Sequence, residues 1–211
     1  MTLQNRVDPF GAVHAVPQQG RFTGNRGIIH NPATKTLLKR RWTTAAWIVC
    51  ALDHPQGKKR EVMGGNTPSG GAGWTELFFL DEVTALAAGH RPCFYCRRAA
   101  ATRFQHCFAA GNRLEHVAAP EIDRLLHAQR LARPRPQLDA DEIRNLPSGT
   151  IIAAQGQPLA IRGEKMLAWG FGGYVDWGDL PASAKLLTPP ASVAALRGSY
   201  VPEWHITAGP Q

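Results

Sequence analysis

Two cysteines separated by two residues, Cys93 and Cys96, are the strongest chemical signal in this sequence. A Cys-x-x-Cys turn allows two thiolates to bind one tetrahedral zinc ion, with Zn–S bonds of about 2.3 Å. Arg91, Arg97 and Arg98 surround the pair, and nearby guanidinium groups favour the thiolate form that binds metal. Four cysteines in 211 residues are too few for a disulfide scaffold. The pair therefore indicates metal or redox chemistry inside a reducing compartment.

A four-coordinate site needs further ligands, and these are expected upstream of the pair. Cys50 and His54 are the leading candidates, and His30 and His14 are alternatives. Residues four apart on a strand lie about 13 Å apart, so Cys50 and His54 can share an ion only if the chain bends between them. The alternative interpretation is that Cys50 is a small apolar core residue and that the Cys-x-x-Cys turn holds no metal.

The segments that position these cysteines show strand and helix signals. Residues 41–53 and 58–63 predict a hairpin, because a β-branched and aromatic run is followed by His-Pro-Gln-Gly and a second run. Residues 74–80 predict another strand. Asp81 is placed to cap a short helix, and Gly89 is placed to end it. The cysteine pair then follows this helix directly.

Residues 81–96, DEVTALAAGHRPCFYC, resemble the second half of the zinc-binding domain of the bacterial Ada family of alkylation-response proteins. That family has a similar helix followed by A-L-A-A-G-x-R-P-C-x-x-C. The positions that match it are Ala85, Leu86, Ala87, Ala88, Gly89, Arg91, Pro92, Cys93 and Cys96. The resemblance extends weakly over residues 42–98, where Cys50-x-x-x-His54 is the nearest match to the first Cys-x-x-x-Cys pair of the family.

The resemblance implies a small domain that holds one zinc ion through four ligands and contacts DNA through basic residues. On this pattern Cys93, Cys96, Cys50 and His54 are the metal ligands. In Ada a zinc-bound cysteine also takes a methyl group from a backbone phosphotriester. Methyl transfer needs an exposed, activated zinc thiolate, and no residue here is an unambiguous candidate, so that reaction is not predicted.

The net positive charge of the chain lies entirely in its first half. The formal net charge is +8, and residues 1–110 hold 14 Lys and Arg against 6 Asp and Glu, whereas the rest holds 10 against 10. Aromatic residues are interleaved with the basic clusters, which is typical of a phosphate-contacting surface with stacking platforms. The predicted phosphate contacts are Arg41, Lys58, Lys59, Arg60, Arg91, Arg97 and Arg98. The alternative is an ordinary solvated surface.

A helix predicted from residue 120 carries the best acid–base group in the chain. Asp123, His127 and Arg130 are spaced by four and three residues, so they share one stripe, with His116 and Glu121 nearby. Such a group suits hydrolysis of nucleic acid. The alternative is a solvated face opposite the apolar stripe of the helix.

The predicted fold class is α+β, built as an Ada-like zinc module with a β-rich C-terminal part. Residues 1–40 predict an extended or looped arm, residues 41–146 an Ada-like domain with a helical extension, and residues 147–211 a small β-meander part packed on it. Two helices extend the module, one from near residue 97 and one after residue 120. The first has Ala100, Phe104, Cys107 and Phe108 on one side. The second has Ile122, Leu125 and Leu126 as its buried stripe. Residues 149–174 predict a three-stranded antiparallel meander, and residues 188–197 a last helix.

These patterns predict a DNA-associated, Ada-like zinc-binding protein that contacts phosphate through a basic surface. Two other functions fit: a nucleic-acid-processing hydrolase that uses the His116 to Arg130 group, and a protein-interaction module with an acidic partner. No apolar run reaches the eighteen or so residues of a bilayer span, and the first twenty residues lack the apolar stretch of a secretory signal. We therefore expect a cytoplasmic protein. The glycine-rich segments fit no nucleotide-binding pattern, so zinc is the one cofactor predicted.

Overall fold

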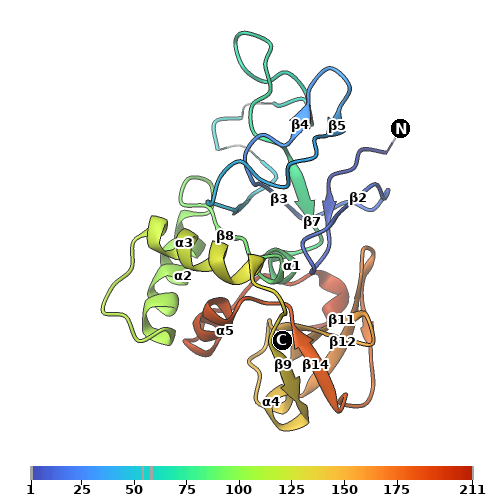
Figure 1. Ribbon diagram of the computed structural model, residues 1–211, viewed down its shortest axis with the longest axis vertical. Coiled ribbons are helices and arrows are strands. Elements are labelled where there is room, and N and C mark those ends of the chain that lie inside the picture. The colour runs from blue at the N-terminus through green and yellow to red at the C-terminus, as the bar shows by residue number, and fades with distance from the viewer. Residues whose placement is uncertain (1, 54, 58, 211) are drawn as a thin grey trace.

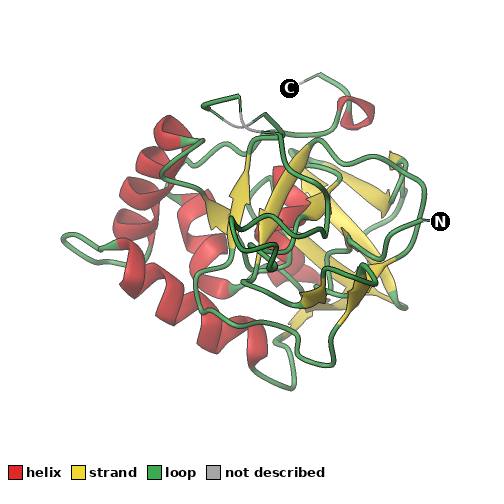
Figure 2. Ribbon diagram, turned by 90° about the horizontal axis from the view of Figure 1, so that it is seen from above, coloured by secondary structure: helices red, strands yellow, loops and turns green. Residues whose placement is uncertain are grey.

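The computed structural model describes residues 2–53, 55–57 and 59–210. Within these ranges the strands form two six-stranded sheets and one two-stranded sheet, and five α-helices accompany them. The molecule is elongated, with the first sheet toward one end and the second sheet at the other (Figure 1). Seen from above, most of the helices gather on one side and the strands on the other (Figure 2). The chain has the α+β fold that the sequence predicts.

The first sheet holds both cysteine-bearing segments, in the strand order β2-β1-β7-β3-β6-β8. Its strands are short: β1 Arg6–Val7, β2 Val13–His14, β3 Phe22–Asn25, β6 Ile48–Cys50, β7 Leu77–Phe79 and β8 Arg91–Pro92. β1 pairs with β7 and β6 with β8 in parallel, and the other neighbours are antiparallel. The strands β4 His30–Asn31 and β5 Thr36–Leu37 form the separate two-stranded sheet.

Residues 2–40 contribute β1, β2 and β3 to the first sheet and β4 and β5 to the two-stranded sheet, whereas the sequence predicts an extended or looped arm over residues 1–40. β1 and β3 lie on the two sides of β7, so the middle of this sheet is built largely from the N-terminal segment. Val7 and Phe22 are buried there in one core with Leu77 and Phe79. The prediction missed these strands because strands of two to four residues are too short to show an alternating period.

Among the described residues, the hairpin predicted from residues 41–53 and 58–63 does not form. Both sides of β6 are occupied, because it pairs with β3 on one side and β8 on the other. Residues 59–63 are a loop, in which Arg60 Nε and the Met63 backbone N–H donate to the Glu76 carboxylate, at 2.8 and 2.9 Å. The strand predicted over residues 74–80 is confirmed as β7.

Helix α1, Glu82–Ala87, lies between the two sheets, and all six of its residues are buried (Figure 1). Asp81 caps it as predicted, accepting hydrogen bonds from the Thr84 N–H at 2.8 Å and the Thr84 hydroxyl at 2.7 Å. The other carboxylate oxygen of Asp81 accepts from the Tyr174 hydroxyl at 2.8 Å. Gly89 follows with a φ of +81°, a conformation that favours glycine. Asp81 therefore caps α1 and also links this helix to Tyr174 near the other end of the molecule.

The helices α2 Arg98–Gly111, α3 Ala119–Leu131 and α5 Pro190–Arg197 share one apolar core. Phe104 and Phe108 of α2 and Ile122 and Leu126 of α3 are fully buried in it, as the predicted apolar stripes require. Leu125 was also predicted to be buried, but its side chain is 36% exposed. The buried face of α3 is instead completed by two polar residues, described below.

The second sheet has the order β13-β12-β11-β10-β14-β9. Its strands are β9 Gln137–Asp139, β10 Ile151–Ala154, β11 Gln157–Arg162, β12 Lys165–Gly170, β13 Gly173–Asp176 and β14 Ser183–Leu186. The meander therefore has four consecutive strands, one more than predicted, and β14 and β9 extend it. Helix α4, Ala140–Arg144, follows β9, and a 3-10 turn, Ile206–Ala208, lies near the C-terminus.

The C-terminal residues pack against the first part of the chain. One core joins Leu80, Val83 and Ala87 to residues of the second sheet such as Ile151 and Trp169. Among the described residues, none of the helices combines the length and the apolar character needed to cross a bilayer.

Candidate metal centre and its cavity

Three of the four cysteines come together at one end of the first sheet. The sulfur atoms of Cys50, Cys93 and Cys96 all lie within 4.8 Å of one another. The sheet produces this arrangement, because β6 and β8 are parallel neighbours in the register Val49 to Pro92. Val49 and Pro92 are each followed by a cysteine, Cys50 and Cys93. The Cys93 N–H donates to the Val49 carbonyl at 3.0 Å. Cys50 and Cys93 therefore lie side by side at the strand ends.

A tight turn brings Cys96 back to the same point. The Arg97 N–H donates to the Cys93 carbonyl at 2.9 Å, and this bond closes the turn ahead of α2. The Tyr95 N–H donates to the Cys93 sulfur at 3.4 Å. Backbone donors aimed at sulfur stabilise thiolates, so the turn is preorganised for negative charge.

The three thiols share their protons unequally. Hydrogen bonds from Cys50 and Cys96 lower the pKa of Cys93 to about 2. The same contacts raise the pKa of Cys50, because its thiol is the donor. For Cys96 the hydrogen bond with Cys50 lowers the pKa, but the bond with Cys93 and burial outweigh it and the pKa is raised. The contacts within the cluster therefore favour the thiolate form at Cys93, and a bound cation would displace the protons that remain.

The donor set and its dimensions fit a thiophilic metal ion. In a tetrahedral zinc site with Zn–S bonds of 2.3 Å, neighbouring sulfurs are about 3.8 Å apart, within the 4.8 Å limit of this cluster. Three cysteine sulfurs are soft ligands that select zinc, copper(I) or iron–sulfur clusters over magnesium or calcium. The predicted fourth ligand, His54, lies outside the described residues. Of the predicted ligands, Cys50, Cys93 and Cys96 are brought together.

The cluster forms part of the wall of a cavity of about 820 Å³. Strands β3, β6 and β7 supply Thr23, Asn25, Cys50 and Phe78, and the loops of residues 51–76 and 93–96 supply the remaining walls. The aromatic rings of Trp74 and Tyr95 also line the cavity. A cavity of this volume is within the range of small-molecule sites.

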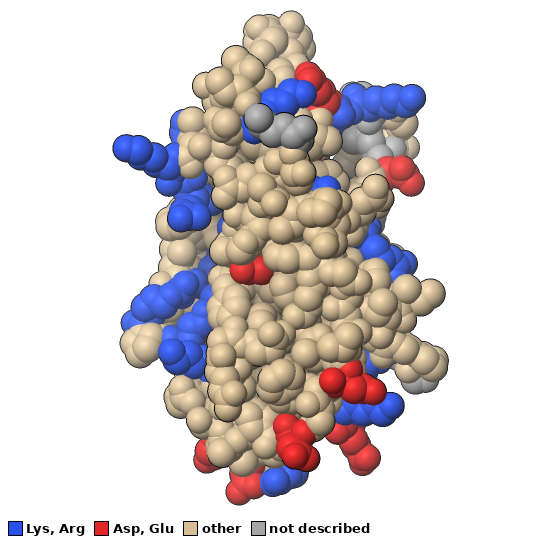
Figure 3. Space-filling model, turned by 90° about the vertical axis from the view of Figure 1, so that its right-hand side faces the viewer, with Lys and Arg blue, Asp and Glu red and all other residues tan. Residues whose placement is uncertain are grey.

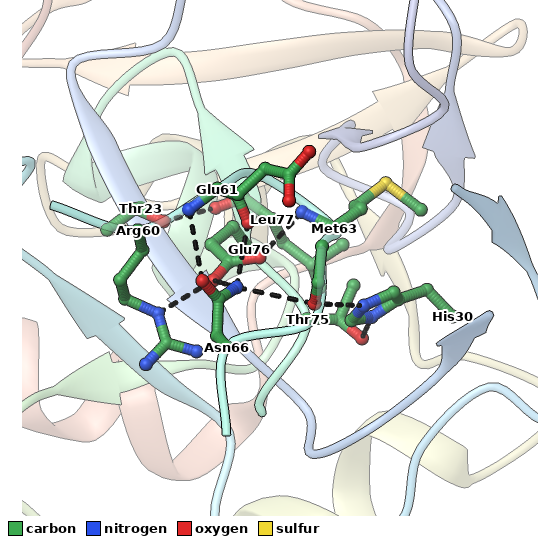
Figure 4. Close-up of polar contacts among 10 residues, drawn as sticks. Thr23, His30, Arg60, Glu61, Met63, Asn66, Thr75, Glu76 and Leu77 are labelled. Carbon is green, nitrogen blue, oxygen red and sulfur yellow. Dashed lines mark hydrogen bonds and ion pairs between the residues drawn. The ribbon is translucent and has the colours of Figure 1, made fainter. Parts of the chain in front are cut away.

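Glu76 fixes the loop that forms one wall of the cavity. Its side chain is nearly fully buried and accepts from Arg60 Nε, from the Met63 N–H and, at 3.5 Å, from the Asn66 amide (Figure 4). The Arg60 guanidinium in turn lies 4.7 Å from the centre of the Trp74 ring. Neither Glu76 nor Trp74 was predicted as a site residue, since no local motif links them to the cysteines.

Two of the predicted phosphate contacts are not available to a phosphate, which corrects the prediction. Arg91 is buried and forms a bidentate ion pair with Asp123, with both N–O distances 2.8 Å. Arg97 is buried between Glu82 at 2.8 Å and Glu203 at 2.7 Å. Burial alone would lower the pKa of Arg97, but these carboxylates raise it. Arg91 thus neutralises the buried Asp123, and Arg97 the buried Glu82 and the exposed Glu203.

The remaining predicted cations are closer to solvent. Arg41, Lys59 and Arg98 are exposed, Arg60 is half-buried, and Lys58 lies outside the described residues. Lys59 and Arg60 line the cavity beside the cysteines. On the face shown in Figure 3, Lys and Arg lie mainly along the edges, and Asp and Glu gather at the lower end, which the second sheet forms. The net positive charge lies in the half of the sequence that carries the cysteines.

The predicted acid–base group is not assembled in the described structure. Asp123 is committed to Arg91, and the Glu121 carboxylate accepts from the Ala118 N–H at 2.8 Å at the start of α3. His127 Nδ1 lies 2.7 Å from Arg130 Nη2, and burial followed by the charge of Arg130 lowers the pKa of His127. His116 is exposed beside a different hollow, at the end of α2. Asp123, Glu121 and His127 are therefore engaged in contacts within the protein.

A second cationic group, which no sequence pattern predicts, is buried around Trp47. The guanidinium carbons of Arg26 and Arg130 each lie 4.0 Å from the centre of the Trp47 ring. The His90 ring lies 5.1 Å from the Trp47 ring, and its Nε2 is 3.3 Å from Arg26 Nε. Burial, then the charges of Arg26 and Arg130, hold the pKa of His90 well below its usual value. His90 is therefore neutral in the folded protein.

Comparison of the chain with protein-family models, with curated proteins and with solved structures finds no match in any of the three.

Proposed function

We propose that the protein binds one zinc ion through Cys50, Cys93 and Cys96 and associates with DNA through the exposed cations around that centre. The observation that carries the proposal is the convergence of three sulfurs from separate segments within 4.8 Å. A backbone N–H donor, such as that of Tyr95 to the Cys93 sulfur, stabilises a metal-bound thiolate. A neutral thiol without a metal does not require such a donor. The resemblance of residues 81–96 to the Ada family supports the same metal and the same partner.

DNA is the proposed partner because the available cations lie around the metal centre. Lys59 lies beside the cysteines in the cavity wall, and Arg98 opens the helix that follows the Cys-x-x-Cys turn. Arg41 is exposed in the segment that leads into β6. A polyanion that neutralises several such side chains releases counterions, which makes its affinity depend steeply on salt.

Metal analysis of the purified protein tests the first half of the proposal. We expect one equivalent of zinc in the wild type and a large loss of zinc in Cys93→Ser and Cys50→Ser. The matched control is Cys107→Ser, because Cys107 lies outside the cluster, on α2. Substoichiometric metal in the wild type, with unchanged thermal stability in Cys93→Ser, would remove the zinc assignment.

A salt series with short duplex and single-stranded DNA tests the second half. We expect the logarithm of the affinity to fall linearly with the logarithm of the salt concentration. An acidic polypeptide of similar charge is the comparison, because an acidic protein would meet the same side chains. Preference for the polypeptide at equal salt would overturn DNA as the partner and support the protein-interaction function.

Hydrolysis of nucleic acid by the His116 to Arg130 group has less support, because its members are separated and engaged. Incubation of labelled DNA and RNA with the wild type and with His127→Ala tests this directly. Turnover that His127→Ala abolishes would restore the hydrolase function. Its absence would leave the group with a structural role.

A further inference from the structure

We propose that the cavity beside the cysteine cluster receives an unstacked nucleobase, with the phosphate of that nucleotide at Lys59. The proposal deepens the proposed function, since it names what part of a nucleic acid reaches the metal centre. It rests on the shape and chemistry of the cavity wall, which hold whether or not DNA also binds elsewhere. The source of the base is either a free nucleotide or an unpaired residue of a strand.

The aromatic wall is the first reason. Trp74 and Tyr95 line a cavity of about 820 Å³ together with Phe78. Tyr95 is 60% exposed, so a ligand in the cavity can reach its ring. Stacking of a base on an aromatic side chain is worth about 1–3 kcal/mol and does not depend on the identity of the base. The wall therefore suits a flat, neutral, heteroaromatic group.

The orientation of the Trp74 ring is fixed before any ligand binds. The Arg60 guanidinium lies 4.7 Å from its centre, and Glu76 holds that guanidinium by an ion pair of 2.8 Å. Gly73 allows this close approach, because a Cβ at that position would lie 2.4 Å from Arg60 Nη2. A ring that is already held loses little entropy when a base stacks on it, so binding is stronger for the same contact.

The floor of the cavity offers hydrogen-bonding groups that the fold does not use. Asn25 is only 8% exposed, and its Oδ1 accepts from the Gly27 N–H at 3.1 Å. Its Nδ2 donates no hydrogen bond to any described residue. Thr23 beside it donates its hydroxyl to the Leu77 carbonyl at 3.0 Å, which leaves that oxygen able to accept. An unused donor next to an acceptor is the complement of the edge of a nucleobase.

Charge decides which end of a nucleotide enters. Three thiolates around one divalent ion leave a net charge of −1 at the cysteine centre, and Asp53 adds a carboxylate to the same cavity. A phosphate is repelled from that end, whereas a neutral base is not. Lys59 is exposed and lines the cavity, so it provides the cation for the phosphate.

The test uses a short single-stranded oligonucleotide with one 2-aminopurine, the same sequence as a duplex, and 2-aminopurine nucleoside 5′-monophosphate. Stacking on Trp74 and Tyr95 is expected to quench the fluorescence of the probe. Tyr95→Ala is expected to weaken binding by roughly 5- to 150-fold, the equivalent of one lost stack. Tyr95→Phe keeps the ring and is expected to stay within about 2-fold of the wild type.

Asn25→Asp sharpens the test, because it keeps the acceptor for the Gly27 N–H and removes the donor that faces the cavity. We expect it to weaken binding about 5-fold or more, as for a lost hydrogen bond in a closed site. Trp177→Ala is the matched control for loss of an exposed aromatic ring, since Trp177 lies beyond β13, and it is expected to change nothing. Zinc content and thermal stability are measured on every variant, so that a damaged fold is recognised.

The results separate the two proposals. One outcome is that the oligonucleotide binds in a salt-dependent way while the fluorescence of its 2-aminopurine is not quenched, and that Tyr95→Ala and Asn25→Asp leave its affinity unchanged. This result would overturn the base cavity and leave DNA association standing. Stoichiometric zinc without binding of any probe would overturn both the base cavity and the DNA partner and leave only the metal site. Equal affinity for the monophosphate and the single strand identifies a free nucleotide as the source. Tighter binding of the single strand than of either other probe identifies an unpaired residue.

Discussion

The two sheets have the same number of strands but differ in what they bury. The strands of the first sheet have two to four residues, and its end of the molecule buries polar side chains such as Thr23, Asn25, Arg26, His30 and Glu76. The strands of the second sheet reach six residues, and the inner faces of its central strands are almost wholly apolar. Because the strands are short, loop backbone begins close to the centre of the sheet. Its N–H and C=O groups need polar side chains as hydrogen-bond partners. The site forms at such strand ends.

This difference in buried polarity indicates that the first sheet is the part of the molecule that can hold reactive groups. The second sheet obtains its stability from packing, so its side chains are interchangeable with others of similar volume. The first sheet depends on specific pairs that satisfy buried charge, and a change in one partner leaves the other uncompensated. We therefore expect mutations in the two regions to differ both in size and in what they affect.

The largest effect is expected from Asp123→Asn. The substitution leaves the buried Arg91 guanidinium without its carboxylate, and breaking one side of a buried ion pair costs about 3–5 kcal/mol. The measurement is the free energy of unfolding from urea denaturation. Asp141→Asn is the control, since it breaks the exposed pair with Arg144 and is expected to cost less than about 1 kcal/mol. Equal effects for the two variants would show that Arg91 does not depend on Asp123.

A slightly smaller effect is expected from Leu159→Ala in the second sheet. Leu159 is fully buried in β11, and removal of a buried leucine side chain costs about 2–5 kcal/mol because a cavity remains. Unlike Asp123→Asn, which acts on the strand next to the cysteines, this variant is expected to keep its full zinc content. The comparison between the sheets fails if the metal is lost along with the stability.

The third effect depends on pH and comes from His90, which is buried against the Trp47 ring. The pKa of His90 is lowered in the folded protein, so below about pH 6.5 the unfolded chain binds a proton that the folded protein does not. Stability is then complete above that pH and is lost as the pH falls, by up to about 1.4 kcal/mol per pH unit for one group. His127 acts in the same direction, since its pKa is also lowered.

Urea unfolding between about pH 7 and pH 5.5 measures this loss, above the range in which most carboxylates titrate. Nuclear magnetic resonance of the His90 ring provides the control, because it is expected to show a neutral imidazole throughout that range. A His90 ring that gains its proton near pH 6.5 without loss of stability would contradict the prediction.

The smallest effect on stability is expected from Lys59→Ala, together with a clear effect on DNA. An exposed lysine contributes less than about 0.5 kcal/mol to folding. If it contacts one phosphate, its removal reduces the salt slope of DNA binding by about 1. Lys185→Ala is the control, because Lys185 is exposed on β14 in the second sheet. Equal changes in the two salt slopes would place the DNA contact elsewhere.

The sequence was sufficient for features set by neighbouring residues. The Asp81 cap, the short helix, Gly89 and the Cys-x-x-Cys turn all lie within sixteen residues, and each follows from local hydrogen bonding. The apolar stripes of α2 and α3 were also visible, because a helix repeats its buried face every three to four residues.

Long-range pairing accounts for what the sequence did not predict. Arg91 and Arg97 look like free cations until Asp123 and Glu203 are placed beside them, 32 and 106 residues further along the chain. The hairpin prediction was wrong for the same reason, since the partners of β6 are β3 and β8 and not the next segment. Asn25 carries no motif at all, and only the sheet places it near the cysteines.

The positions of Cys50 and Cys93 in the chain have a consequence for how this protein can diversify. A cation shared by these two residues closes the whole segment between them into a ring. Lengthening a ring costs little free energy, only about 0.6 kcal/mol for each doubling. Insertions within residues 55–73 would therefore reshape one wall of the cavity while the sulfurs stay in register through β6 and β8. Ligand preference and metal geometry can thus evolve separately.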